Sequence, residues 1–293
     1  MTTSNNRRRR FLCLLLSLIT VAGVLATLGA AADGASPRAS FPAGAVETPV
    51  HLNGYEVLPG ECVRIGGVTY VPLRHFSELF GSCTVTWNGK TNTATVKTEK
   101  LTLIVQTGNY YIYANGRYLY TVGAVLNLGG SLYVPIRPIA LAFDAELNWN
   151  AKQSRVELTS ALKGGAIAPA SYNEDEVYWL SRIISAESKG EPFLGQMAVG
   201  NVVLNRVRST SYPNTIYGVI FDRKHGTQFS PVSFGTIYQA PTESAIIAAK
   251  VCLEGYTLSD TVLFFMNPRI ATSNWISQNR PYAFTIGNHD FYN

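Results

Sequence analysis

Apolar residues recur at helical spacing in the C-terminal part of the chain. Leu180, Ile183 and Ile184 lie three or four positions apart, which places them on one face of a helix predicted from residue 176 to about 188. Two more helices are predicted, from 192 to about 209 and from 241 to about 254. The stretches between and after them are rich in aromatic residues and Asn, and we expect loops there: 225–232, 262–275 and 285–293.

An acidic residue continues the apolar face of the first of these helices. Glu187 follows Ile184 by three positions, and the letters "KGEP" at 189–192 predict that one helix ends and the next begins just after it. Partial burial and the negative end of the helix dipole both raise the pKa of a carboxyl group. Glu187 is therefore predicted to hold a proton near neutral pH, although spacing alone also allows a solvated acid at a helix end.

A pattern of short strands occupies residues 50–160 and occurs twice. The stretch "GVTYVPLRHFSELFGSCTVTWNGKTNTATV" from Gly67 aligns with "GSLYVPIRPIALAFDAELNWNAKQSRVEL" from Gly130. Each copy predicts a hairpin, a short helix that opens at "YVPLR" or "YVPIR", and a strand pair around Trp87 or Trp149. The expectation is an α+β domain over 48–160 with a pseudo-twofold repeat, a linker over 161–173, and a second domain over 174–293.

The start of the chain has the layout of an export signal. Four arginines precede an apolar run from Phe11 to Ala32 that ends in small residues, so residues 1–32 are predicted to be a signal peptide. The run is also long enough to span a bilayer, which leaves an uncleaved anchor as the alternative. We expect a secreted or cell-wall-associated protein that meets the membrane only through an uncleaved leader.

Charge and cysteine content narrow the expected partners. The leader carries four of the 24 Lys and Arg residues, and the remainder nearly balance the 19 acids, so no basic face for nucleic acid is expected. Cys62 and Cys83 lie in a region predicted to be exported, where a disulfide can persist, and a bridge between them is one expectation. Cys252 is predicted to be a small buried residue on a helix.

Residues 50–160 resemble the copper amine oxidase N-terminal-like domain. The resemblance rests on the "YVPLR" pattern followed by a Gly or Asp, a Trp and a strand, which both copies match. His51 and His75 are the only histidines of this region, and neither is expected to bind a metal. The resemblance implies a wall-associating or spacer module beside a catalytic domain.

Residues 174–293 resemble the SleB/CwlJ family of cell-wall and spore-cortex hydrolases. Seven stretches carry the resemblance in order: "LSRIISAESKGEPFLGQMAVGNVVLNRV", "YPNTIYGVIF", "QFSPV", "AAKVCLEG", "FFMNP", "SNWI" and "IGNHDFY". The family is similar to goose lysozyme and the lytic transglycosylases, which implies a mainly helical fold. It cuts the glycan strands of peptidoglycan with one glutamate as general acid. That role falls on Glu187, because protonating a glycosidic oxygen near neutral pH requires a carboxyl group that keeps its proton.

The resemblance also suggests residues that contact the sugars. Gln228, Phe229 and Ser230 are expected to line the cleft, the alternative being a loop that Phe229 anchors. Phe264 and Phe265 could contact a sugar, but adjacent aromatic residues at the end of an apolar run belong to a core at least as often. Trp275 is a candidate for stacking on a sugar. His289 could orient substrate or hold the C-terminal tail. The predicted substrate-binding residues are Gln228, Phe229, Ser230, Phe265, Asn267, Trp275 and His289.

The absence of an obvious second acid favours a lytic transglycosylase over a hydrolytic muramidase. Hydrolysis by two carboxylates needs a partner for Glu187. Glu191 is expected to face solvent and Glu243 to begin a helix, while Asp222, Asp260 and Asp290 are expected in turns. No cofactor or metal is predicted.

Three less favoured alternatives remain open from the sequence. A zinc amidase would need about three protein ligands, whereas the second domain has two histidines, His225 and His289. A cysteine peptidase would rest on Cys252, and a non-catalytic wall-binding protein would need no acid. The oligomeric state cannot be predicted from these residues.

Overall fold

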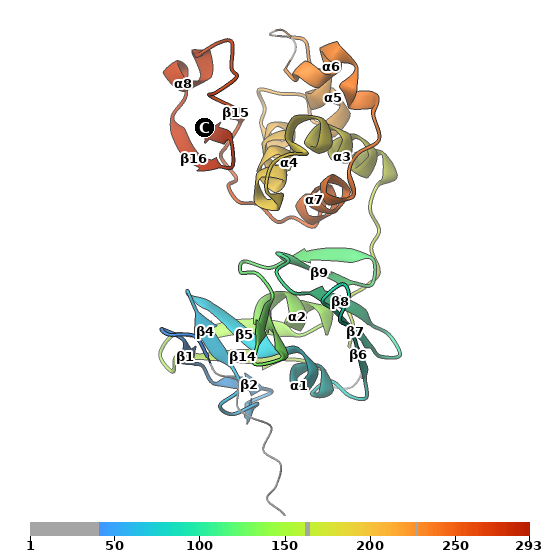
Figure 1. Ribbon diagram of the computed structural model, residues 1–293, viewed down its shortest axis with the longest axis vertical. Helices are drawn as coiled ribbons and strands as arrows, with labels where there is room; N and C mark the ends of the chain where they lie inside the picture. The colour runs from blue at the N-terminus through green and yellow to red at the C-terminus, as the bar shows by residue number, and fades with distance from the viewer. Residues whose placement is uncertain (1–40, 162–164, 225, 227) are drawn as a thin grey trace, which may run out of the picture. The chain divides into compact units, whose positions relative to one another are not determined.

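The computed structural model describes residues 41–161, 165–224, 226 and 228–293 (Figure 1). The predicted signal peptide, part of the predicted linker and His225 lie outside the described residues. Strands dominate up to residue 159 and helices dominate from residue 174, so the protein has the predicted mixed α+β architecture. Among the described helices, none has both the length and the apolar character needed to cross a bilayer.

The N-terminal part, which we call the repeat region, contains strands β1–β14 and two short helices. The elements are β1 (Val46–Glu47), β2 (Val50–Leu52), β3 (Tyr55–Val57), β4 (Val63–Ile65), β5 (Val68–Pro72), α1 (Leu73–Glu78), β6 (Thr84–Asn88), β7 (Thr93–Lys97), β8 (Thr102–Gln106), β9 (Tyr111–Ala114), β10 (Arg117–Tyr120), β11 (Leu126–Leu128), β12 (Ser131–Pro135), α2 (Ile136–Ala142), β13 (Glu146–Asn150) and β14 (Arg155–Thr159). Each copy of the repeat therefore has the predicted order of hairpin, helix and strand pair.

The two copies meet through equivalent strands. β5 pairs with β12 in antiparallel register, with Tyr70 opposite Pro135, Val71 opposite Val134 and Pro72 opposite Tyr133. This register is self-complementary because the same "YVP" letters lie on both sides. It is the pairing that a pseudo-twofold axis requires. The two prolines end the strands and precede α1 and α2, where a missing N–H costs nothing.

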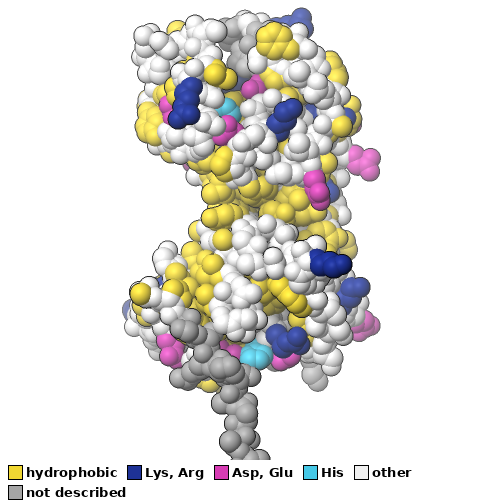
Figure 2. All heavy atoms as spheres, viewed as in Figure 1, with side chains coloured by type: hydrophobic (Ala, Val, Ile, Leu, Met, Phe, Trp, Pro, Cys, Tyr) yellow, Lys and Arg dark blue, Asp and Glu magenta, His cyan; other side chains and the backbone are white. Residues whose placement is uncertain are grey.

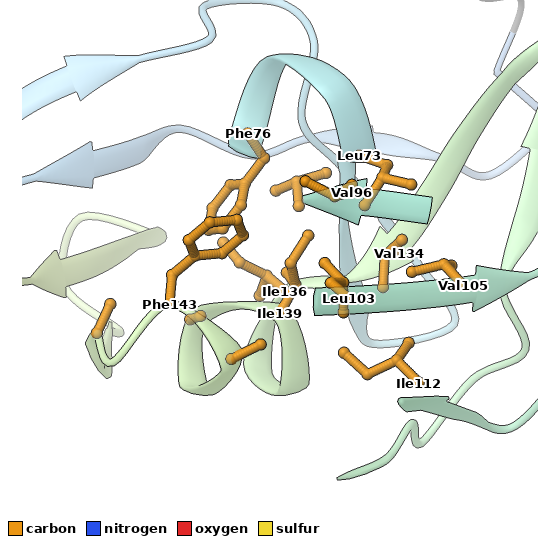
Figure 3. Close-up of a cluster of buried hydrophobic side chains, with 14 of the residues drawn as sticks. Leu73, Phe76, Val96, Leu103, Val105, Ile112, Val134, Ile136, Ile139 and Phe143 are labelled. Atoms are coloured by element: carbon orange, nitrogen blue, oxygen red, sulfur yellow. The ribbon is translucent and has the colours of Figure 1, made fainter. Parts of the chain in front are cut away.

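Large apolar side chains from both copies form one core in the repeat region (Figure 3). The rings of Phe80 and Phe143 stack at 4.7 Å, and Phe76 lies 5.3 Å from Phe80. Trp87 and Trp149 occupy matching positions on the edge strands β6 and β13, and each is about half exposed. The sheets are ordered β1-β4-β5-β12-β11, β10-β9-β8-β7-β6 and β13-β14-β2-β3.

The expected disulfide of the repeat region is absent, which corrects that expectation. Both Cys62 and Cys83 are free thiols. Cys62 is 1% exposed inside the core, where burial raises its pKa to about 12, and Cys83 packs half-buried at the edge of the same core. Each sulfur therefore serves as an apolar group, and the chain spacing carried no information about their contact.

The second part, which we call the helical region, begins at residue 174. Its elements are α3 (Glu174–Ser188), α4 (Phe193–Arg208), α5 (Ile216–Ile220), α6 (Ser230–Phe234), η1 (Thr236–Tyr238), α7 (Glu243–Leu253), β15 (Phe264–Met266), α8 (Trp275–Asn279), β16 (Tyr282–Ile286) and β17 (His289–Tyr292). The three long helices match the predicted ones, with ends that differ by one or two residues.

The prediction that residues 262–275 and 285–293 form only loops was wrong. They contribute to a three-stranded sheet in the order β15-β17-β16. A two-residue turn at Gly287-Asn288 joins β16 to β17, and Gly287 has a φ of +62°, which favours glycine. The letters "YAFTIGNHDFY" carried this hairpin signal, but the aromatic and Asn content was read as irregular structure.

Helices α3, α4 and α7 pack together and form the centre of the helical region (Figure 1). Leu180, Ile183 and Ile184 are fully buried, as the helical spacing predicted. Gly200 on α4 allows the close approach, since a Cβ there would lie 2.9 Å from Ile184 Cδ1 and 3.0 Å from Cys252 Sγ. Cys252 is the predicted buried residue on a helix, and burial raises its pKa to about 12.

Candidate active site

Helix α3 carries Glu187 in its last turn. Asn173 caps the start of the helix, where its side chain accepts hydrogen bonds from the N–H groups of Asp175 at 3.0 Å and Glu176 at 3.4 Å. The helix ends at Ser188, and Pro192 caps the start of α4, so the chain breaks where the letters "KGEP" predicted. The break leaves the Glu187 carboxyl at the helix end, beside the buried apolar face.

Glu187 has an environment that favours its protonated form. Burial raises the pKa of its carboxyl group to about 7, while the charge of Arg206 acts in the opposite direction. Among the described residues, none donates a hydrogen bond to this carboxylate, and such bonds are what would stabilise the ionised form. A carboxyl group with a pKa near 7 can both give and take a proton near neutral pH.

Arg206 on α4 is a buried cation that the sequence analysis did not identify. Its side chain is 4% exposed, and Nε donates a 2.8 Å hydrogen bond to the carbonyl of Leu263. The guanidinium lies 5.1 Å from the ring centroids of Tyr212 and Phe229. Among the described carboxylates none lies within ion-pair distance of it. In the sequence, this buried cation could have been found as a charged residue on the inward face of an otherwise apolar helix.

Arg206, whose charge acts on Glu187, contacts one of the predicted cleft residues. Its Nη1 lies 3.5 Å from Gln228 Oε1, and the Gln228 amide also donates to the carbonyl of Gly226 at 3.3 Å. Phe229 is 2% exposed, so the expectation that its ring forms a floor for a sugar is wrong. Phe229 instead anchors the loop before α6, and its chain neighbours Gln228 and Ser230 are half-buried and exposed.

The strand β15 supplies the next group of predicted residues. Phe265 is half-buried, with its ring 6.5 Å from Phe229 and 5.3 Å from the imidazole of His289, and packs as part of the core. Asn267 organises the following turn, where Oδ1 accepts from the N–H of Arg269 at 3.0 Å. Its polar groups serve the fold of this loop.

Trp275 is an exposed member of the predicted sugar-binding residues. It is 51% exposed at the start of α8, and its ring centroid lies 6.4 Å from that of Phe264. The guanidinium of Arg280 lies over both rings, 4.5 Å from Phe264 and 5.2 Å from Trp275. This platform offers an aromatic face and a cation side by side.

His289 is a buried residue of β17 and is 6% exposed. Burial lowers the pKa of its imidazole, and Nδ1 has no hydrogen-bond partner among the described residues. The neighbouring Asn288 donates to the Glu191 carboxylate from its N–H at 2.8 Å and from its side chain at 3.1 Å. Glu191 therefore does not simply face solvent as expected. It fastens the β16–β17 turn to the start of α4.

Three further acids of the helical region, Asp222, Asp290 and Glu243, lie where they stabilise a turn, a strand pair or a helix start. Asp222 accepts from the N–H of Lys224 at 2.9 Å, and Asp290 accepts from the hydroxyl of Thr285. Glu243 lies exposed in the first turn of α7, where a negative charge favours the helix dipole. Burial raises the pKa of Glu187 to about 7, whereas at Glu191 the hydrogen bonds from Asn288 outweigh burial and lower the pKa.

Charged groups elsewhere are dispersed. On the face shown in Figure 2, the Lys, Arg, Asp and Glu side chains are scattered and form no large patch of one sign. Within the described residues, no group of three or more His, Cys, Asp and Glu side chains is placed to hold a metal ion.

The raised pKa of Glu187 predicts the pH dependence of any reaction in which it acts as an acid. The proton is present below about pH 7 and is lost above it, so kcat/KM should fall about tenfold for each pH unit above that value. Rates measured between pH 5 and 9 on one soluble glycan substrate test this. A profile that stays flat to pH 9 would contradict the role of Glu187 as acid.

Each of the two parts of the chain matches a known protein family. The family described as Cell Wall Hydrolase matches residues 190–292, and the Copper amine oxidase N-terminal domain matches residues 52–158. The chain is 31% identical over 119 residues to the cell wall hydrolase CwlJ of Oceanobacillus iheyensis, an alignment that covers 38% of this chain and 83% of CwlJ.

Longer relatives match over alignments of similar length. A spore cortex-lytic enzyme of Bacillus cereus is 40% identical over 127 residues, which cover 43% of this chain and 48% of that enzyme. The Bacillus subtilis enzyme of that name is 37% identical over 134 residues, covering 45% and 43%. The chain thus spans about half the length of these relatives. The solved catalytic domain of the germination-specific lytic transglycosylase SleB from Bacillus anthracis is 40% identical, with a TM-score of 0.39, covering 43% of this chain and all of that domain.

Proposed function

Because the chain belongs to the cell wall hydrolase family, we propose that it is an exported enzyme that cuts the glycan strands of peptidoglycan. The bond concerned joins muramic acid to N-acetylglucosamine, and Glu187 protonates its oxygen. One observation carries the proposal: a half-buried carboxyl group at the end of α3 has a pKa of about 7 and lies near a buried cation, Arg206.

The proposed reaction uses Glu187 twice. Its carboxyl group first gives its proton to the leaving oxygen as the bond to the anomeric carbon of muramic acid breaks. The charge of Arg206 then stabilises the carboxylate that forms. The 6-hydroxyl of the same muramic acid attacks the anomeric carbon and returns its proton to Glu187. The product is a 1,6-anhydro ring, and no water is consumed.

A hydrolytic muramidase is the alternative outcome of the same chemistry. A water molecule would take the place of the 6-hydroxyl and would itself need a base. The surroundings of the other described acids favour transglycosylation, because Glu191 is bonded to Asn288, and Asp222 and Asp290 accept local hydrogen bonds. Glu187 can serve as the base once it has given up its proton.

We propose supporting roles for the surrounding residues. Of the predicted substrate-binding residues, Gln228, Ser230 and Trp275 are accessible; we assign Trp275 a ring face for a sugar and the other two hydrogen bonds to it. His289 and Phe265 hold the sheet against the core. The repeat region is proposed to associate with the cell wall or to act as a spacer, and the leader to direct export.

Digestion of purified peptidoglycan tests the proposed activity. The full-length protein is incubated with vegetative sacculi and with spore cortex, and both new glycan ends and newly exposed peptide amino groups are quantified. We expect new glycan ends from at least one substrate and no new amino groups. New amino groups alone would indicate an amidase. If neither new glycan ends nor new amino groups form, the proposed enzymatic activity is rejected.

A further inference from the structure

A group of partly exposed aromatic side chains lies on the helical region, and we call it the aromatic patch. It consists of Tyr178 and Trp179 on α3, Tyr217 on α5, Phe221 just after α5, and Tyr238 in η1. The ring of Trp179 is at the centre, with centroids at 4.9 Å to Tyr178, 5.2 Å to Tyr217 and Phe221, and 6.4 Å to Tyr238. The three tyrosines are 43%, 53% and 61% exposed in chain order.

A cation is held at the edge of the aromatic patch. The guanidinium of Arg182 lies 3.6 Å from the ring centroid of Tyr178, which fixes its position. Its Nε is buried and has no hydrogen-bond partner among the described residues, and no described carboxylate pairs with it. The partly exposed guanidinium therefore adds a positive charge to the edge of the patch.

The aromatic patch shares its supporting elements with the candidate active site. Trp179 precedes Glu187 by eight residues on α3, which corresponds to about 12 Å along the axis and about 80° around it. The chain that places Gln228 beside Arg206 continues through α6 to Tyr238. Glu187 and the centre of the aromatic patch are therefore separated by about 12 Å along the axis of α3.

We propose that the aromatic patch binds the peptidoglycan glycan strand at a distance from the bond that is cut, an inference that rests on the function proposed above. Sugar rings present apolar C–H faces and polar edges, and tyrosine presents an apolar face with a hydroxyl at its tip. The N-acetyl and lactyl oxygens of the strand suit the positive charge of the Arg182 guanidinium. The exposed tyrosine rings lie on the same helix-and-loop segments as the candidate active site, so the polymer that binds at Glu187 is the ligand that we assign to them.

Binding without cleavage isolates this contribution. In a Glu187→Gln background, which leaves strands intact, Tyr217→Ala with Tyr238→Ala removes two exposed rings, and Tyr217→Phe with Tyr238→Phe keeps them. For long soluble glycan strands we expect Kd to rise about tenfold in the alanine variant and to stay within about threefold in the phenylalanine variant. For short fragments that reach only the region of residue 187, all three proteins should bind alike.

Cleavage by the same substitutions in the active background gives a second readout. The alanine variant should cut short fragments at the parent rate and show a raised KM for long strands alone. Equal affinity of the alanine and parent proteins for long strands would overturn the proposal. So would a loss of affinity for short fragments as large as that for long strands. A third contrary result is sedimentation showing that the rings mediate only self-association of the protein.

The failure of this inference is distinguishable from failure of the proposed function. Cleavage of short fragments by the unaltered protein supports the function whatever the rings do. If the double alanine variant melts early, the single variant Tyr238→Ala, which removes the most exposed ring, replaces it, with an expected rise in Kd of about threefold.

Discussion

Replacing Glu187 with Gln should abolish glycan cleavage. The amide keeps the shape of the side chain and removes the proton that the leaving oxygen needs, and loss of a positioned general acid costs about a hundredfold or more in rate. Release of soluble fragments from sacculi by equal amounts of folded protein measures this. Activity within a few fold of the unaltered enzyme would show that another group supplies the proton.

The control for this substitution is Glu243→Gln, which changes the same functional group at an exposed position in the first turn of α7. It should leave the cleavage rate within about twofold of that of the unaltered enzyme.

The stability of Glu187→Gln gives a further check. Because the folded pKa of Glu187 is raised, its contribution favours the folded state below about pH 4.5 and is lost as pH rises through about 7. Above pH 7, Glu187→Gln should therefore be more stable, by up to ~3 kcal/mol.

Phe291→Ala should strongly lower the free energy of unfolding. Phe291 is fully buried on β17, the central strand of the small sheet, with its ring 5.0 Å from that of Phe284 and 6.0 Å from that of Phe265. Removal of a buried phenylalanine ring costs about 3–5 kcal/mol. Because the lost packing lies under Phe265 and the strand that carries His289, activity should fall together with stability. Urea unfolding measures the change.

Phe234→Ala is the matched control for this prediction, since Phe234 is 78% exposed on α6. Its removal should change the free energy of unfolding by less than about 0.5 kcal/mol. Equal effects of the two substitutions would mean that the sheet formed by β15, β16 and β17 does not pack on the helices as described.

The sequence predicted best where one repeating pattern determined the structure. The spacing of Leu180, Ile183 and Ile184 gave the buried face of α3, and the break at 189–192 located Glu187 in its last turn. The duplicated "YVP" letters likewise predicted two equivalent hairpin–helix units. In both cases neighbours along the chain determine the outcome, so local periodicity was sufficient.

Features that depend on contacts between distant segments were not predictable in this way. Arg206 comes to the site because α3 and α4 pack together, and its contact with Gln228 spans a separate loop. Phe229 was predicted to form the aromatic floor of the cleft, yet its ring is buried in the core, as the alternative of a loop anchor had it. The thiols of Cys62 and Cys83 failed as a predicted bridge for the same reason, since separation along the chain does not report the positions of side chains.

The most direct test of the account is digestion of peptidoglycan in heavy-oxygen water followed by mass spectrometry of the products. Single-acid transglycosylation by Glu187 predicts 1,6-anhydromuramic ends without incorporated heavy oxygen, formed by the unaltered enzyme and absent with Glu187→Gln. Reducible muramic acid ends that carry heavy oxygen would show a hydrolytic muramidase. Reducible N-acetylglucosamine ends, or unchanged products from Glu187→Gln, would contradict the bond and the residue to which we assign the chemistry.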